Sequence, residues 1–99
     1  MSEPIAPDMM KRHLDGIKSM TATQVCALWR FARIGHPYFN SVDVNLRPLF
    51  QAVEAQMAAT GGMTPSISKD IDSMADYWRR RVNRIDVDTP FQQDRVEAQ

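Results

Sequence analysis

Few residues of this chain belong to the types that perform chemistry in proteins, and they are widely spaced. The two histidines, His13 and His36, lie far apart, and neither has a second histidine or a cysteine at the short spacing of a zinc site. Cys26 is the single cysteine, which excludes an intramolecular disulfide and suits a reducing compartment. We therefore expect neither a metal site nor a cofactor.

Nucleophilic and phosphate-binding chemistry find equally little support. Spacing alone leaves a Cys–His pair between Cys26 and His36 open, but no other residue favours it, and a small buried hydrophobe is the default interpretation of Cys26. His36 precedes a proline and is typical of a loop residue with a local hydrogen bond. The pair Gly61-Gly62 is not followed by Lys and Ser or Thr, as a phosphate loop requires. We expect a protein that is not an enzyme.

Charge and hydropathy exclude further classes of protein. Twelve basic and twelve acidic residues cancel, which removes the general attraction to nucleic acid or anionic lipid. No run approaches the roughly 18 apolar residues of a membrane span, and no signal-peptide pattern opens the chain. Glycine is scarce and no apolar–polar alternation indicates strands. These features predict a cytoplasmic all-α domain that does not enter a membrane.

The clearest helical pattern follows Gly61-Gly62. Thr64 can cap a helix whose first residue is Pro65, and apolar residues then recur with a helical period to residue 85. The acidic residues fall in the first half of this segment and the arginines in the second, as the helix dipole favours, and Asp76–Arg80 makes a favourable pair. The pattern predicts one helix over 65–85, with the stripe Ile67, Ile71, Met74, Trp78, Val82 and Ile85.

Three further helices are predicted over 7–20, 23–34 and 45–60. Thr21 and Thr23 each offer an N-cap for the second, and Asn45 offers one for the third. Gly35 and Gly61 can supply the left-handed residues that end these two helices. The second helix carries apolar residues on two faces, which favours a central position in the fold or contact with a partner.

The expected architecture is a compact four-helix bundle with flexible N- and C-terminal tails. Residues 1–6 form a flexible tail, 7–86 the helical domain, and 87–99 an extended or disordered tail that Val87 and Phe91 can anchor. The large side chains expected in the core are Trp29, Phe50, Met57, Ile71, Met74 and Trp78.

The helix–Gly–Gly–x–Thr–Pro–helix segment is similar to a helix-turn-helix, which would bind DNA through its second helix. Two observations oppose this interpretation. With Gly61 as the turn glycine, Met57 and Asp70 occupy places usually held by a small and an aliphatic residue; with Gly62, Ser68 falls where an aliphatic residue is expected. Asp70 would also face the phosphates. A DNA-binding transcriptional regulator therefore remains the alternative function.

Two sequence segments resemble small uncharacterised proteins of proteobacterial prophages and plasmids. They are GHPYF at 35–39 and GGMTPSISKDI at 61–71, and the resemblance covers about the central half of the chain. It assigns no residue roles. It implies a small protein that binds and modulates a phage or host protein, and an inhibitor of host defence, of the anti-CRISPR kind, is one such protein.

A partner surface is predicted where aromatic and arginine side chains could meet, because both are enriched at binding hot spots. This requires the helices 23–34 and 65–85 to lie side by side. The alternative is that Phe31 and Ile34 belong to the core and the arginines to a solvated face. The partner would be another protein or a second copy of the chain, whose zero net charge does not oppose dimerisation. The predicted surface comprises Phe31, Ile34, Tyr38, Phe39, Arg79, Arg80 and Arg84.

Overall fold

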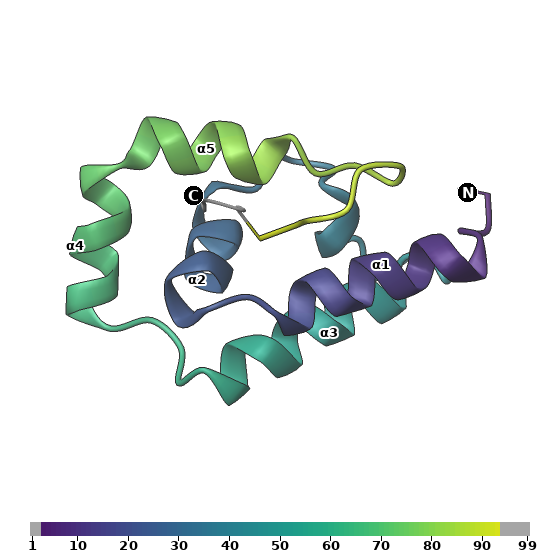
Figure 1. Ribbon diagram of the computed structural model, residues 1–99, viewed down its shortest axis with the longest axis horizontal. Coiled ribbons are helices and arrows are strands. Elements are labelled where there is room, and N and C mark those ends of the chain that lie inside the picture. The colour runs from purple at the N-terminus through teal and green to yellow at the C-terminus, as the bar shows by residue number, and fades with distance from the viewer. Residues whose placement is uncertain (1–2, 94–99) are drawn as a thin grey trace.

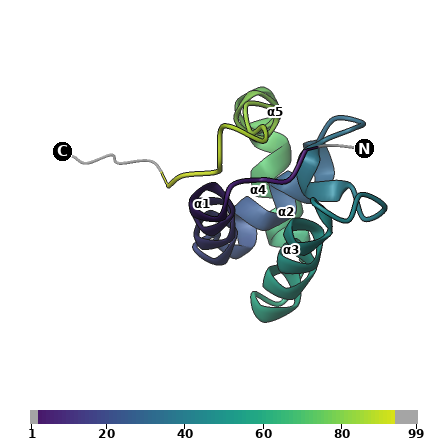
Figure 2. The same cartoon turned by 90° about the vertical axis from the view of Figure 1, so that its right-hand side faces the viewer.

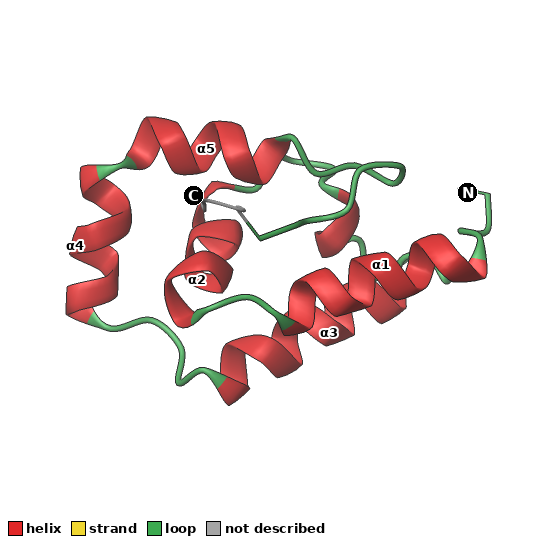
Figure 3. Ribbon diagram, viewed as in Figure 1, coloured by secondary structure: helices red, strands yellow, loops and turns green. Residues whose placement is uncertain are grey.

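Helix α2 (Ala22–Phe31) lies at the centre of the fold, which is a computed structural model that describes residues 3–93 (Figure 1). Helices α3, α4 and α5 all contact α2, while α1 packs along α3. The described residues are helical or loop, as expected for an all-α protein, and their one β-bridge joins Asp86 to Thr89 (Figure 3). The other helices are α1 (Pro7–Lys18), η1 (Pro37–Phe39, a 3-10 helix), α3 (Arg47–Ala59), α4 (Pro65–Ser73) and α5 (Ala75–Asn83).

The central position predicted for the second helix is confirmed. Four consecutive residues, 25–28, are fully buried, and consecutive residues point in all directions around a helix. The helix begins with a capping box, in which the Thr21 hydroxyl accepts from the Gln24 amide and the Gln24 side chain accepts from Thr21 N–H. The predicted extension to residue 34 is wrong. The Asn83 side chain instead binds the carbonyl of Phe31 and the N–H of Arg33, where the chain leaves the helix in an extended conformation.

Three predictions concern the ends of α3 and the start of α4, and one of them is wrong while two are confirmed. Asn45 does not cap α3, because the first amides of the helix donate to the main-chain carbonyl of Asp43 instead. Gly61 directly follows Thr60, the C-cap of α3, and has φ +91°, a left-handed conformation that glycine adopts readily. The Thr64 hydroxyl caps α4 by accepting from Ile67 N–H at 3.1 Å.

The single helix predicted over 65–85 is two helices that change direction sharply at Met74 (Figure 1). Two local bonds accompany the break: Ser73 donates its hydroxyl to the Asp70 carbonyl at 2.7 Å, and Met74 N–H bonds Ile71 rather than Asp70. The break lets α4 and α5 both pack on α2. The architecture therefore has five α-helices within the described residues and is not the four-helix bundle that the sequence predicted.

The predicted core is correct in part. Ile71 and Trp78 are buried, and Phe50 and Met57 are half-buried. Met74 is 51% exposed because it lies at the corner between α4 and α5, and Trp29 is 45% exposed. Helical periodicity correctly assigns both residues to an apolar stripe, but it does not show which parts of a stripe the neighbouring elements leave uncovered.

The C-terminal segment, residues 86–93, crosses between α5 and α1 (Figure 1). It starts with a turn that two reciprocal backbone hydrogen bonds close between Asp86 and Thr89. Phe91 is then buried, whereas the Val87 side chain is 42% exposed, so of the two proposed anchors Phe91 fills the role. Gln93 exchanges hydrogen bonds with the Gln24 side chain and donates to Ser19. Residues 1–2 and 94–99, which belong to the two predicted tails, lie outside the described residues.

Gly16 allows the C-terminal segment to lie directly on α1. A Cβ atom at this position would stand 2.2 Å from the Phe91 carbonyl oxygen, far inside van der Waals contact. We predict that Gly16→Ala lowers the free energy of unfolding by about 1–3 kcal/mol, the usual cost of overpacking. Chemical denaturation measures this change. Alanine is the better helix former by about 1 kcal/mol, so a variant as stable as wild type or more stable would contradict the close contact.

The two tryptophans should differ in their contribution to stability. We predict that Trp78→Ala costs about 3–5 kcal/mol, because the indole is 8% exposed and its removal leaves a cavity. Trp29→Ala should cost about 2 kcal/mol or less, because nearly half of that side chain is already in water. Denaturant titrations of both variants test the difference. Equal losses would contradict the assignment of Trp78 to the core and Trp29 to the surface.

Candidate interaction surfaces

The side chains of His13 and Tyr38 form a buried hydrogen-bond network that holds the C-terminal segment. The Tyr38 hydroxyl lies 2.7 Å from His13 Nδ1 and accepts from the Phe91 amide at 3.2 Å, while His13 Nε2 lies 2.9 Å from the Val87 carbonyl. One assignment of protons satisfies every group: Tyr38 donates to Nδ1, and Nε2–H donates to Val87. Burial raises the pKa of Tyr38 to about 12, so its hydroxyl keeps its proton at neutral pH.

His36 is also used within the structure. Its Nδ1 accepts from Tyr38 N–H at 3.1 Å, the local bond that the sequence suggested, and its Nε2 donates to the Val82 carbonyl at 2.9 Å. Burial lowers the pKa of His36 to about 4, an effect that the positive charge of Arg33 reinforces and that the Val82 bond and Asp86 oppose. A proton on Nδ1 would face the N–H of Tyr38. The ring is therefore neutral at physiological pH.

Cys26 is fully buried and does not pair with a histidine. Its thiol lies 3.7 Å from the sulfur of Met57, and burial raises its pKa, which disfavours the thiolate. The open question of a Cys26–His36 pair is answered, since both nitrogens of His36 have other partners. Within residues 3–93, no three His, Cys, Asp or Glu side chains stand close enough together to hold a metal ion.

The structure does not assemble the predicted partner surface as one patch, although α2 does lie beside α5. Tyr38 is fully buried and is therefore not part of any surface. Phe31 is half-buried and stacks under the Arg79 guanidinium, whose carbon lies 5.2 Å from the ring centroid. Ile34 is completely exposed in the loop that follows α2. Phe39 is half-buried but packs with a different group of aromatic residues.

The three arginines of the predicted partner surface also lie in different surroundings. Arg79 pairs with Asp76 at 3.1 Å, so the pair expected between Asp76 and Arg80 is wrong. Arg80 is exposed on α5. Arg84 lines a pocket on the side of α5 that faces α1 and the C-terminal segment.

A different group of side chains, which we call the aromatic surface, gathers where α2, η1 and α3 meet. It comprises Trp29, Phe39 and Phe50. The Trp29 ring meets Phe39 edge-on at 5.3 Å between centroids and stacks on Phe50 at 6.2 Å, and Phe39 meets Phe50 at 6.1 Å. Such arrangements are favourable for aromatic pairs. They fix the orientation of an indole that remains nearly half exposed.

A shallow groove of about 400 Å³ begins at the aromatic surface. Trp29 forms one wall, Met57 and Ala58 of α3 form another, and the glycines 61–62 form the end. Glu54 contributes the one charged side chain of this lining. The groove is thus mainly apolar, with a carboxylate at its rim, and it is a suitable shape for an apolar side chain of a partner.

Sequence reasoning missed most of this surface because it placed Trp29, Phe50 and Met57 in the core. Each lies on the apolar stripe of its helix, and a stripe does not show where coverage by other elements ends. The one usable signal was Phe39, since the segment around it is more apolar than a solvated loop requires. Three aromatic residues from three segments meet here, and no local pattern predicts that.

The segments that resemble a helix-turn-helix do not pack as one. In that motif two helices pack against each other across the turn. Here α3 and α4 each pack on α2 and share few direct contacts. Asp70 is exposed on α4, where its charge would repel a phosphate backbone. This arrangement gives no support to the DNA-binding alternative.

Comparison with known proteins gave no match among family models, curated sequences or solved structures. Within residues 3–93, the helices are too short or too polar for any of them to cross a bilayer.

The lowered pKa of His36 predicts how the stability of the fold depends on pH. Above about pH 6.5 the residue is neutral in both the folded and unfolded chain. As the pH falls further, His36 binds a proton in the unfolded chain but does not bind one in the folded chain until about pH 4. The free energy of unfolding therefore decreases across this pH range. The total loss should be about 3 kcal/mol.

Denaturation at several pH values measures this slope. His36→Gln should flatten it, because the glutamine amide can still donate to Val82 but does not titrate. An NMR titration that places the pKa of His36 near 6.5 in the folded protein would contradict the prediction.

Proposed function

We propose that this chain is a non-enzymatic binding protein that modulates another protein through the aromatic surface. The observation that carries the proposal is the exposure of Trp29. Its side chain packs against two phenylalanine rings and lines a groove, and yet it is 45% exposed. Tryptophan is among the residues most enriched at binding hot spots, and such residues act in well-packed pockets that a partner closes to water.

The rigidity of the aromatic surface supports this function. Contacts with Phe39 and Phe50 hold the indole before binding, so little side-chain freedom remains to be lost when a partner docks. An apolar side chain of the partner would fill the groove between Trp29 and Met57, and a basic group beside it would meet Glu54. The partner that fits this surface is a protein segment with an apolar anchor and a neighbouring Lys or Arg.

The proposal agrees with the context that the sequence resemblance implies. Small proteins of prophages and plasmids that modulate a phage or host protein need a compact scaffold with one binding surface. The broken helix α4–α5 and the central α2 provide such a scaffold, and the aromatic surface supplies the contact. Inhibition of a host-defence protein is one form that this modulation would take.

We predict that Trp29→Ala abolishes partner capture while the protein stays folded. Removing a hot-spot side chain costs 2 kcal/mol or more, which is roughly a 30-fold loss of affinity. Immobilised wild type, Trp29→Ala and the control Met74→Ala would be exposed to lysate of the native cells, and bound proteins would be quantified by mass spectrometry. Met74 is slightly more exposed than Trp29 but lies at the corner between α4 and α5. Proteins enriched by wild type and Met74→Ala, and lost with Trp29→Ala, are the expected result.

Three other outcomes would contradict the proposal. Undiminished capture by Trp29→Ala, with loss on Phe31→Asp, would return the function to the surface predicted from the sequence. A wild-type dimer in light scattering that Trp29→Ala makes monomeric would assign the surface to a second copy of this chain. Tight duplex binding in a gel shift that falls steeply with salt would establish the DNA-binding alternative.

A further inference from the structure

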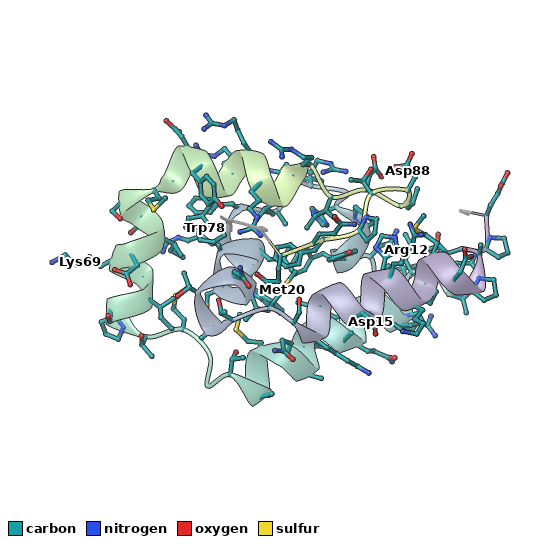
Figure 4. All side chains as sticks on the ribbon, viewed as in Figure 1. Arg12, Asp15, Met20, Lys69, Trp78 and Asp88 are labelled. Carbon is teal, nitrogen blue, oxygen red and sulfur yellow. The ribbon has the colours of Figure 1, made fainter. Side chains whose placement is uncertain are left out.

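The C-terminal segment, residues 86–93, lies across the rest of the fold as a bound peptide lies on its receptor. It contains no helix and passes from the end of α5 to α1. Figure 4 shows Asp88 at the outer bend of this path, with Arg12 on α1 below it. Phe91 is the one buried residue of the segment. The segment is therefore held at the surface and not within the core.

Side chains of the helices bind the backbone of residues 90–93. The buried Tyr38 hydroxyl accepts from the Phe91 amide at 3.2 Å, and Arg81 donates to the Gln92 carbonyl at 3.0 Å. Because these bonds go to main-chain groups, they require an extended backbone more than particular side chains. Many proteins recognise extended peptides in this way, with a side-chain contact added for specificity.

Phe91 supplies that side-chain contact. Its ring centroid lies 4.8 Å from the guanidinium carbon of Arg81. Its backbone lies so close to Gly16 that an added Cβ would stand 2.2 Å from the Phe91 carbonyl oxygen. These residues form a site that matches one aromatic residue in an extended chain. We call this site the segment groove, and it comprises Gly16, Tyr38 and Arg81.

The segment does not fill the space between α1 and α5. A cavity of about 400 Å³ opens beside it toward α5, and one of about 480 Å³ opens toward α1, both lined by residues 90–93. Elements with few buried contacts open locally at a smaller free energy than the whole fold. Residues 90–93 can therefore leave the groove while the helices remain packed.

A chain whose residues 90–93 have left the groove selects the same residues again. The buried Tyr38 hydroxyl would lose the Phe91 amide, and the site of the Phe91 ring would open to water. An unpaired buried polar group and an exposed apolar site are both unfavourable. The groove fits this segment equally well whether it belongs to the same chain or to a second copy.

We propose that two copies of this chain exchange residues 90–93, so that Phe91 of each copy fills the segment groove of the other. The exchange re-forms the same contacts between chains, and such swapping is a low-cost route to a symmetric dimer. The hinge is the turn that two backbone hydrogen bonds close between Asp86 and Thr89. The bond between His13 and the Val87 carbonyl keeps the first half of this turn on its own chain.

The exchange uses no residue of the aromatic surface, so it does not depend on the function proposed above. The dimer carries the aromatic surface twice, once on each copy. If that surface binds a partner with repeated sites, two linked copies hold the partner more tightly than one copy does. The segment groove would then set the valency of the binding protein.

The test mixes two variants that each lack one half of the contact. Phe91→Ala keeps the segment groove but loses the ring that fills it, whereas Gly16→Leu keeps the ring but places a side chain in the path of the segment. At micromolar concentration each variant alone should be a monomer in light scattering. Mixed in equal amounts they should form a dimer of one copy of each, because Phe91 of one chain fills the intact groove of the other.

The matched control replaces Gly16→Leu with the double variant Gly16→Leu/Phe91→Ala, which offers no ring to the intact groove and should not associate. Trp29→Ala introduced into both chains of the mixed pair should leave the dimer unchanged, and dissociation would assign the dimer to the aromatic surface and overturn this proposal. Circular dichroism confirms that each variant keeps its helices.

A measurement on the wild type does not depend on the folding of any variant. The effective concentration of the segment within its own chain is about millimolar. The wild type should therefore be a monomer at micromolar and partly a dimer at millimolar concentration. A concentrated mixture of isotope-labelled and unlabelled chains should show intermolecular NOEs between the Phe91 ring and Gly16.

Four results would each overturn the exchange. They are a mixed pair of variants that stays monomeric, a control pair that associates as tightly as the mixed pair, a wild type that stays monomeric at millimolar concentration, and a wild-type dimer in which the contacts of Phe91 remain within one chain.

Discussion

The buried side chains of His13 and Tyr38 connect three parts of the chain through one hydrogen-bond network. It connects α1 to η1, and the same two side chains bind the backbone of the C-terminal segment at Val87 and Phe91. Figure 2 shows this segment passing between α5 and α1, where main-chain polar groups would otherwise be buried without partners. An imidazole and a phenol suit the position because each can supply one donor and one acceptor.

The aromatic surface and a pocket beside the C-terminal segment both depend on this arrangement. Phe91, fixed through the Tyr38 hydroxyl and through contact with Gly16, lines the pocket, which lies between α1, the end of α5 and the C-terminal segment. Phe39, the next residue after Tyr38, packs in the aromatic surface. Consecutive residues of η1 therefore serve the core network and the exposed cluster. Changes at Tyr38 would therefore disturb the aromatic surface and the pocket beside Phe91 at once.

The sequence predicted those features that short-range chemistry determines. Thr64 and Pro65 start α4 because a hydroxyl cap and a proline at the first position act within one turn. The break at Met74 was not predicted, because the apolar stripe continues through it and the gain comes from packing both halves on α2. The His13–Tyr38 bond escaped prediction for the same reason. It links residues that lie far apart in the chain, and no periodic pattern records that separation.

Contacts between distant parts of the chain also decide which residues form the candidate surfaces, and the sequence does not predict them. An apolar stripe and an exposed binding surface have the same sequence signature until the neighbours of the helix are placed, as Trp29 demonstrates. A row of arginines likewise has two explanations. Arg79 lies over Phe31 and pairs with Asp76, so its charge is locally balanced. Arg84, at the C-cap of α5, instead lines a pocket together with Arg12 of α1 and Asp88 of the C-terminal segment. The two arginines look alike in the sequence, because what separates them is the set of residues that other elements bring to each, and a helical pattern does not record those neighbours.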